Sequence, residues 1–305
     1  LGHALQDSGR LAEAEQVLQR ALALKPAYFE AFNNLAITLQ KQGRLDASID
    51  YFERALALQP AQEDVYGNLL FTLNYHAERS AEQIFDAYRE YDRRFGQPHH
   101  GAWKPHGNER RTDRRLKVGY VSPDFREHAC ARFLEPLLAS HDKHAVEVWA
   151  YAELGREDAV TRRYQGYVDH WVPTRGLSDD ALAERIRADG IDVLVDVAGH
   201  TVGNRLGVFA RKPAPVSLSW LGYGYTTGLA AIDYYLTDAA SVPLGSEGLF
   251  AEEPWRLPAG FVYRPAEGMG EPGPLPALRN GYLTLGTLSR SIRLNDHTLR
   301  AWAAI

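Results

Sequence analysis

Residues 9–26, GRLAEAEQVLQRALALKP, and residues 43–60, GRLDASIDYFERALALQP, carry one pattern at a spacing of 34 residues. In each copy a Gly-Arg-Leu turn opens an amphipathic run, and a proline closes it. Glycine permits the positive φ of a tight turn, and proline ends a helix. The alternative is a pair of unrelated amphipathic helices, but the shared period favours stacked pairs of antiparallel helices.

A 34-residue period with these landmarks is typical of tetratricopeptide repeats. A third copy, residues 62–73, has lost the glycine and proline at the landmark positions of the repeat. Because each repeat buries its apolar face against a neighbour, short arrays rarely stand alone. We expect residues 1–75 to be the end of a longer array. Residues 76–115 should be an adapter helix, at 81–95, and a linker rich in Gly, Pro, His and Arg.

The pattern changes after Arg115, where short apolar runs alternate with helical segments. The predicted strands are residues 116–121, 146–151, 191–197, 215–221 and 232–236. Helices are expected around 133–138 and between a capping Ser178 and a terminating Gly190. This alternation predicts a parallel sheet covered on both faces, which we assign to residues 116–275. Residues 276–305, with a strand at 282–286 and a helix at 297–305, are expected to start a second α/β domain that is mostly missing.

Composition excludes several classes of function. The 305 residues include 34 Lys and Arg against 39 Asp and Glu, a net charge of −5, which argues against a nucleic-acid partner. The sequence has no run of about 18 apolar residues and no signal peptide, so we expect a cytoplasmic protein without a membrane span. Cys130 is the only cysteine, which rules out an intrachain disulfide and a Cys-rich zinc site.

Ligands of open parallel sheets bind where loops leave the carboxyl ends of strands. Three such loops, residues 122–129, 198–203 and 222–228, carry polar, glycine-rich or titratable residues. His128 is the strongest candidate, because histidine can accept a proton from an attacking hydroxyl near neutral pH. Asp124 and Glu127 are near enough in sequence to orient it. The alternative is a solvated or structural histidine, as most of the 11 histidines must be.

The other two loops allow two interpretations each. His200 is either a site residue or a group that closes its loop. The segment 222–228 either presents backbone N–H groups to phosphate or forms a tight turn with tyrosines packed on it. The sequence contains no P-loop, which disfavours P-loop nucleotidases. A G-x-G-x-x-G spacing occurs at residues 268–273, but it lies in a turn-rich stretch and not between a strand and a helix, which disfavours a dinucleotide oxidoreductase. The linker histidines have no carboxylate or cysteine framework around them, and we predict no metal site.

LKVGYVSPDFREHA (116–129) and IDVLVDVAGHTVGNRLGVFARKPAPVSLSWLGYGYTTG (191–228), placed after tetratricopeptide repeats, resemble the O-linked N-acetylglucosamine transferase family. The likeness covers nearly the whole chain in the same domain order. It implies a GT-B fold with two Rossmann-like domains and inverting transfer of N-acetylglucosamine from UDP-GlcNAc to Ser or Thr hydroxyls. It also implies no metal or other cofactor, and protein or peptide acceptors guided by the repeat groove.

The family motifs fall on particular residues. The histidine of D-F-x-x-H falls on His128, as general base or substrate-positioning group, and the G-[HY]-T motif places Thr201 near the donor. In the loop after Trp220, Gly224-Tyr225 replaces the family's Pro-Gly pair, which changes the loop's stiffness. The family lysine that reaches the diphosphate corresponds to Arg293, which keeps the charge but alters the phosphate geometry.

We therefore predict His128 as the catalytic residue, and donor or acceptor binding by Asp124, His200, Thr201, Gly222, Tyr223, Thr226 and Arg293. Two alternatives remain open at this stage. One is a non-catalytic repeat scaffold whose α/β part only binds a ligand or a partner. The other is a related transferase that uses another donor sugar or asparagine acceptors.

Overall fold

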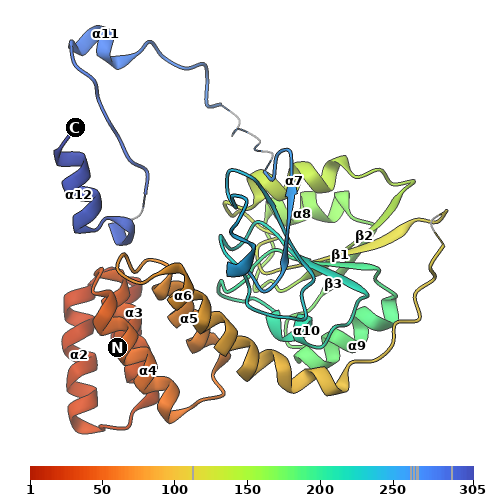
Figure 1. Ribbon diagram of the computed structural model, residues 1–305, viewed down its shortest axis with the longest axis horizontal. Coiled ribbons are helices and arrows are strands. Elements are labelled where there is room, and N and C mark those ends of the chain that lie inside the picture. Colours follow the sequence, from red (N-terminus) through yellow and green to blue (C-terminus); the bar gives the residue numbers. More distant parts are fainter. Residues whose placement is uncertain (112, 262, 264, 266–267, 290) are drawn as a thin grey trace. The chain divides into compact units, whose positions relative to one another are not determined.

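The computed structural model describes residues 1–111, 113–261, 263, 265, 268–289 and 291–305 (Figure 1). Its contacts divide the chain into two compact units. The first, here called the repeat unit, comprises Leu1–Pro60, Phe71–Arg79 and Pro265–Ile305. The second, here called the α/β unit, comprises Ala61–Leu70 and Ser80–Arg264. None of the described helices combines the length and the apolar character that crossing a membrane requires.

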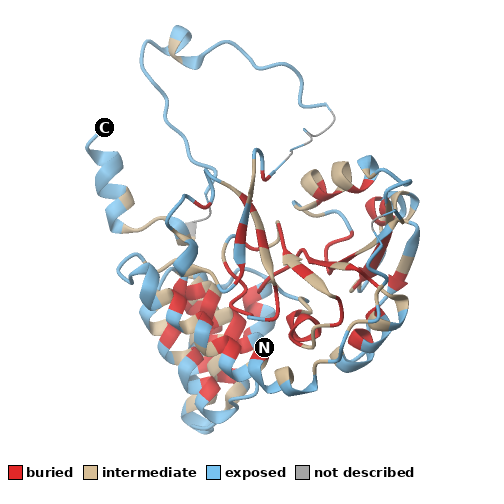
Figure 2. Ribbon diagram, turned by 45° about the vertical axis from the view of Figure 1, so that its right-hand side comes forward, coloured by how far each residue is buried: buried red, intermediate tan, exposed pale blue. Residues whose placement is uncertain are grey.

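The repeat unit contains the predicted antiparallel helices. They are α1 (Gly2–Asp7), α2 (Leu11–Leu24), α3 (Phe29–Lys41) and α4 (Leu45–Leu58). Gly9 and Gly43, at the turns, have φ values of +75° and +78°, so glycine is needed at both positions. Leu18 and Leu35 belong to one buried cluster between the helices, and the buried stripes stand out in Figure 2. These features confirm the prediction of stacked helical pairs.

The end of the chain differs from expectation. It forms α11 (Pro276–Asn280), the 3₁₀ turn η4 (Ser291–Arg293) and α12 (Asp296–Ala303), so the predicted last helix is confirmed. The strand predicted at 282–286 is wrong: no strand forms there in the described chain, and Leu283 and Leu285 are exposed. A strand needs a partner for its backbone hydrogen bonds, and the described residues offer none at this place.

Helices before the sheet belong largely to the α/β unit. α5 (Glu63–Leu73) is followed by α6 (Ala81–Tyr91), the π-helical turn η1 (Asp92–Gly96) and the 3₁₀ turn η2 (Gln97–Ala102). Tyr66 packs against Tyr91 and Phe95, with ring centroids 5.9 and 5.8 Å apart. Residues 61–70 therefore group with the sheet, whereas the sequence placed them with the repeats. The predicted linker is docked: the Trp103 indole donates to the carbonyl of Ala210 at 2.9 Å.

Within the described residues, seven parallel strands form one sheet in the order β3-β2-β1-β4-β5-β6-β7. Their bounds are β1 (Leu116–Ser122), β2 (Val146–Ala152), β3 (His170–Pro173), β4 (Val193–Asp196), β5 (Val216–Ser219), β6 (Tyr234–Asp238) and β7 (Glu253–Leu257). The connecting helices are α7 (Ala131–Ser140), α8 (Ala159–Tyr167), α9 (Asp179–Asp189), α10 (Leu206–Ala210) and the 3₁₀ turn η3 (Glu247–Leu249). Five strands match the predicted runs, whereas β3 and β7 were not predicted.

The strand order identifies where a ligand would bind. From β1 the chain adds β2 and β3 on one side, and then returns to add β4 to β7 on the other. The order thus reverses between β1 and β4, and open parallel sheets bind ligands at the carboxyl edge beside such a reversal. A buried core that includes Tyr120, Leu134 and Val195 holds this part of the sheet rigid.

Candidate active site

The loop after β1 places His128 at the reversal point. The Phe125 side chain is fully buried against Tyr164 and Trp171, and its carbonyl accepts a hydrogen bond from Thr161 at 2.8 Å. Further along, the amide of Glu127 donates to Asp158, the residue that caps α8, at 2.8 Å. These anchors fix the loop on both sides of its tip, so that the His128 side chain, 37% exposed, stands at the surface.

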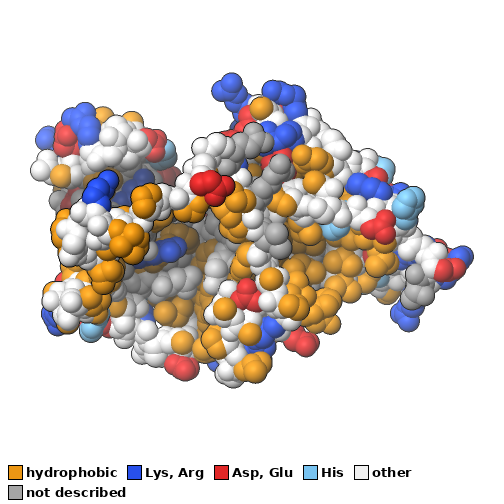
Figure 3. Space-filling model, turned by 90° about the horizontal axis from the view of Figure 1, so that it is seen from above, with side chains coloured by type: hydrophobic (Ala, Val, Ile, Leu, Met, Phe, Trp, Pro, Cys, Tyr) orange, Lys and Arg blue, Asp and Glu red, His pale blue; other side chains and the backbone are white. Residues whose placement is uncertain are grey.

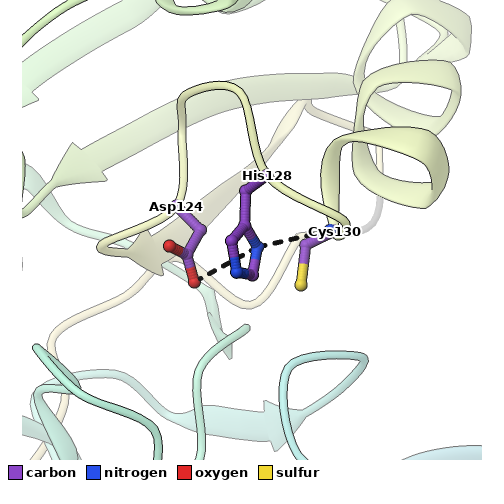
Figure 4. Close-up of side chains that lie close together, drawn as sticks. All are labelled: Asp124, His128 and Cys130. Carbon is purple, nitrogen blue, oxygen red and sulfur yellow. Dashed lines mark hydrogen bonds and ion pairs between the residues drawn. The ribbon is translucent and has the colours of Figure 1, made fainter. Parts of the chain in front are cut away.

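Asp124 is the carboxylate that faces His128 (Figure 4). Its Oδ2 lies 3.6 Å from His128 Nδ1, and its Oδ1 accepts a hydrogen bond from Arg126 at 3.0 Å. The backbone amide of Cys130 donates to His128 Nδ1 at 3.3 Å. The Glu127 carboxylate instead lies 3.8 Å from Arg132. Of the two acidic residues named from the sequence, Asp124 is thus the one placed to act on the imidazole.

A buried carboxylate shapes the loop after β4. Asp196 accepts hydrogen bonds from the amides of Ala198 and Gly199, at 3.1 and 2.9 Å, and from the Ser219 hydroxyl at 2.7 Å. Its burial raises the pKa of the carboxyl group above the ordinary value. Half-buried Thr201 donates to the carbonyl of Ala198 at 2.8 Å. Asp196 thus ties β4, its loop and β5 together at the carboxyl edge.

His200 points into the protein. Its ring is enclosed by Tyr88, Tyr91 and Tyr223, with centroids 5.5, 4.6 and 5.2 Å away. Burial lowers the pKa of the imidazole to about 4. The neutral ring donates from Nε2 to the carbonyl of Thr227, 2.7 Å away, and so joins the loops after β4 and β5. A contact between His200 and a substrate stays a prediction, and the geometry gives His200 a loop-closing position.

The loop 222–228 is packed tightly from within. A Cβ on Gly222 would lie 2.1 Å from the carbonyl oxygen of Val197, so only glycine fits there. The Tyr223 hydroxyl lies 2.6 Å from the Tyr88 hydroxyl, and its side chain is buried. Gly224, in contrast, faces open space. The interpretation as a turn with packed tyrosines is therefore confirmed, whereas phosphate binding by this loop stays a prediction.

Glu252 anchors the same loop through hydrogen bonds. It accepts hydrogen bonds from the Thr226 hydroxyl at 2.5 Å, from the Thr227 amide at 2.8 Å and from the Thr227 hydroxyl. Glu252 and both threonines are buried, and burial raises the pKa of the Glu252 carboxyl group. Thr226 therefore stabilises the conformation of the loop, and its contact with a substrate stays a prediction. The sequence gives no signal for Glu252, because this residue follows the loop by some 25 residues and no local motif marks it.

The three loops predicted from the sequence touch one another. A Cβ on Gly203, after β4, would lie 3.0 Å from Pro123 of the loop after β1. A Cβ on Gly199, whose φ is +53°, would lie 2.2 Å from Tyr223 of the loop after β5. Asp124, His128, Thr201, Gly222, Tyr223 and Thr226 thus share one edge of the sheet. Arg293 belongs to the repeat unit, where its guanidinium lies 5.7 Å from the Tyr75 ring centroid, and its contact with a diphosphate stays a prediction.

Charge on the surface is mixed. On the face drawn in Figure 3, Lys and Arg side chains are interspersed with Asp and Glu. This distribution agrees with the net charge of −5 and offers no single-sign field on that face for a polyanion.

Comparisons with known proteins assign the two parts of the chain. The model of glycosyl transferase family 41 matches residues 93–264, and a tetratricopeptide repeat model matches residues 1–63. The probable UDP-N-acetylglucosamine–peptide N-acetylglucosaminyltransferase SPINDLY of Solanum lycopersicum is 36% identical over 239 residues, which is 76% of this chain and 25% of the relative. The UDP-N-acetylglucosamine–peptide N-acetylglucosaminyltransferase of Caenorhabditis elegans is 36% identical over 150 residues, 48% of this chain and 13% of the relative.

A solved structure matches both parts of the chain. A mutant of the Thermobaculum terrenum O-GlcNAc transferase matches with a TM-score of 0.90 and 32% sequence identity. The match covers 100% of this chain and 58% of that protein. The chain thus spans about a quarter of the length of the first curated relative and somewhat more than half of the solved transferase.

Proposed function

The chain belongs to glycosyl transferase family 41, and from this premise we propose that it forms part of a protein O-GlcNAc transferase. The reaction would move N-acetylglucosamine from UDP-GlcNAc to Ser or Thr hydroxyls of protein acceptors. The relatives' names support the donor and the peptide acceptor. The observation that carries the proposal is the half-exposed imidazole of His128 beside Asp124, at the point where the strand order reverses.

The geometry suggests how the acceptor is activated. For His128 to accept a proton at Nε2, its own proton must sit on Nδ1 and point to Asp124, so the hydrogen bond that the Cys130 amide donates to Nδ1 must open first. As the acceptor oxygen forms its bond to the anomeric carbon, its proton passes to Nε2, and Asp124 stabilises the resulting imidazolium. Such a proton transfer is worth about 10²–10⁴ in rate.

The leaving group departs from the opposite face of the sugar, so the proposed reaction inverts the anomeric centre. The bond between the anomeric carbon and the UDP oxygen breaks, and the sugar gains oxocarbenium character. The diphosphate collects negative charge that a cationic side chain can stabilise without a metal ion. We assign that task to Arg293.

The test is transfer of radiolabelled sugar from UDP-GlcNAc to a protein acceptor by the intact protein. The proposal predicts a labelled acceptor that loses its label under alkaline β-elimination, the reaction that releases sugars from Ser and Thr. It also predicts that unlabelled UDP-GlcNAc competes with the labelled donor more strongly than other UDP-sugars do. Better competition by another UDP-sugar would reassign the donor. Binding of UDP-GlcNAc with no transfer to any acceptor would contradict the activity and favour a scaffold.

A further inference from the structure

A thiol completes a group of metal-ligand types beside the proposed base. In the described part of the chain, Asp124, His128 and Cys130 each offer one ligand atom, and these atoms all lie within 4.8 Å of one another (Figure 4). The three residues come from one short loop and the residue that precedes α7. The proposed transfer reaction uses the carboxylate and the imidazole, but it has no use for the thiol.

We propose that Asp124, His128 and Cys130 form a binding site for a borderline-soft divalent cation such as Zn²⁺. Carboxylate oxygen, imidazole nitrogen and thiolate sulfur are the donors that zinc takes, whereas Mg²⁺ and Ca²⁺ prefer oxygen alone. Three protein ligands leave the fourth tetrahedral position to water, as in open zinc sites. On binding, the cation replaces the thiol proton, which passes to solvent, and a metal–sulfur bond forms.

The surroundings suit such a cation. Arg126 occupies Oδ1 of Asp124, so that Oδ2 remains turned toward His128. The His128 side chain is 37% exposed and Cys130 is half-buried, which gives a cation access from solvent. Ligand atoms around a tetrahedral zinc ion lie roughly 3.5 Å apart, as bond lengths of about 2.0–2.3 Å require. The three atoms now lie within 4.8 Å of one another, so cation binding requires them to move closer and requires His128 Nδ1 to give up the hydrogen bond from the Cys130 amide.

The consequence for activity rests on the proposed function. A cation bound at Nδ1 of His128, the nitrogen that faces Asp124, leaves the ring proton on Nε2, so Nε2 cannot accept the acceptor's proton. The same three residues would therefore make the transferase sensitive to zinc as an inhibitor, with no requirement for it as a cofactor.

The experiment titrates Cd²⁺, a thiophilic probe for zinc sites, into the chain prepared without a histidine tag. Because Cys130 is the only cysteine, any cadmium–thiolate ultraviolet absorption reports this residue alone. The wild type should bind one Cd²⁺ with that absorption, and Cys130→Ser should abolish it. Asp124→Asn and His128→Ala should each weaken the affinity by at least about tenfold, the lower end of the loss from an outer-shell partner. His144→Ala, at an exposed histidine, is the matched control and should bind like the wild type.

Two results would overturn the site. One is the absence of thiolate absorption at saturating Cd²⁺. The other is an equal Cd²⁺ affinity in Asp124→Asn, His128→Ala and the wild type, which would mean that the thiol alone binds the cation. Circular dichroism confirms that each variant is folded. A separate assay measures sugar transfer with and without Zn²⁺. Zinc should inhibit the wild type, and Cys130→Ser should relieve that inhibition. If transfer fails in every preparation, the proposed function falls while the cadmium titration still decides the site. If cadmium binds as expected but zinc leaves transfer unchanged, His128 is not the base.

Discussion

At the scale of single residues, buried ionisable groups hold the candidate site in shape. Asp196, His200 and Glu252 each bond to backbone or hydroxyl groups of the loops at the carboxyl edge of the sheet. An unpaired polar group at these positions would be costly, which explains why each side chain is hydrogen-bonded to its loop. His200 gives the most direct test, because its charge changes within an accessible pH range.

We predict that His200 makes the stability of the α/β unit depend on pH. Its pKa is lowered from 6.5 to about 4, so the unfolded chain binds the proton more tightly than the folded chain does. The stabilisation is complete above pH 6.5 and is lost as the pH falls through about 4. The difference corresponds to roughly 3 kcal/mol of unfolding free energy.

Urea unfolding followed by tryptophan fluorescence, at several values between pH 7 and pH 4, measures this dependence. His200→Gln should flatten the fall in unfolding free energy, because glutamine does not titrate. His144→Gln, at an exposed histidine, should retain it. Curves of equal slope for the wild type and His200→Gln would refute the assignment.

The sequence predicted the candidate site residues better than it predicted the buried side chains that hold their loops in place. The rule that ligands bind where parallel strands end selected the loops that carry Asp124 and His128, and the family resemblance named Thr201. Their contact with a substrate stays a prediction. The burial of His200 and the partners of Thr226 could not be predicted, since both depend on contacts with distant segments. Tyr88 and Tyr91 precede His200 by more than 100 residues, and no spacing rule connects them.

At the scale of elements, β7 supports the loop after β5 through a single carboxylate next to its first residue. Glu252 is buried and bonded to Thr226 and Thr227, whereas Glu253 next to it is exposed. This pair of neighbours gives a matched comparison for the role of the buried carboxylate.

We predict that Glu252→Ala lowers the unfolding free energy by about 3 kcal/mol, because it leaves buried donors of Thr226 and Thr227 without an acceptor. Glu253→Ala should change it by less than about 0.5 kcal/mol, as is usual on a surface. Chemical denaturation measures both values. Equal stability in the two variants would mean that the loop keeps its shape without Glu252.

Strands were predicted where their apolar runs are long, and missed where they are not. β1 and β2 have seven residues each, and their burial is visible as apolar runs. β3 has four residues and includes His170 and Pro173, so its pattern resembles a loop. The strand expected at 282–286 shows the opposite error: β-propensity alone does not form a strand without a neighbour to pair with.

At the scale of the whole molecule, the division into units changes how the repeats should be removed. Residues 61–70 pack within the α/β unit, and the Tyr91 hydroxyl donates to Glu63. A truncation after residue 75 would therefore expose the core of the α/β unit. A truncation after Pro60 removes the paired helices α1 to α4 and leaves those contacts intact.

We predict that deleting residues 1–60 reduces transfer to protein acceptors more than transfer to short peptides, because stacked repeats offer an extended binding surface. The ratio of kcat/KM for a protein acceptor to that for a short peptide measures the effect, and an unfolding curve confirms that the α/β unit is intact. If both acceptors lose the same factor, the repeats serve folding and do not bind acceptors.

The central claim is that His128, presented beside Asp124 where the strand order reverses, accepts the acceptor's proton during sugar transfer. Its most direct test is the transfer rate of His128→Ala under saturating UDP-GlcNAc, with His144→Ala as the matched control. The account predicts a loss of about 10²–10⁴ in the rate for His128→Ala, with UDP binding and the unfolding curve unchanged, and no loss for the control. A rate within a few-fold of the wild type in folded His128→Ala protein would contradict it.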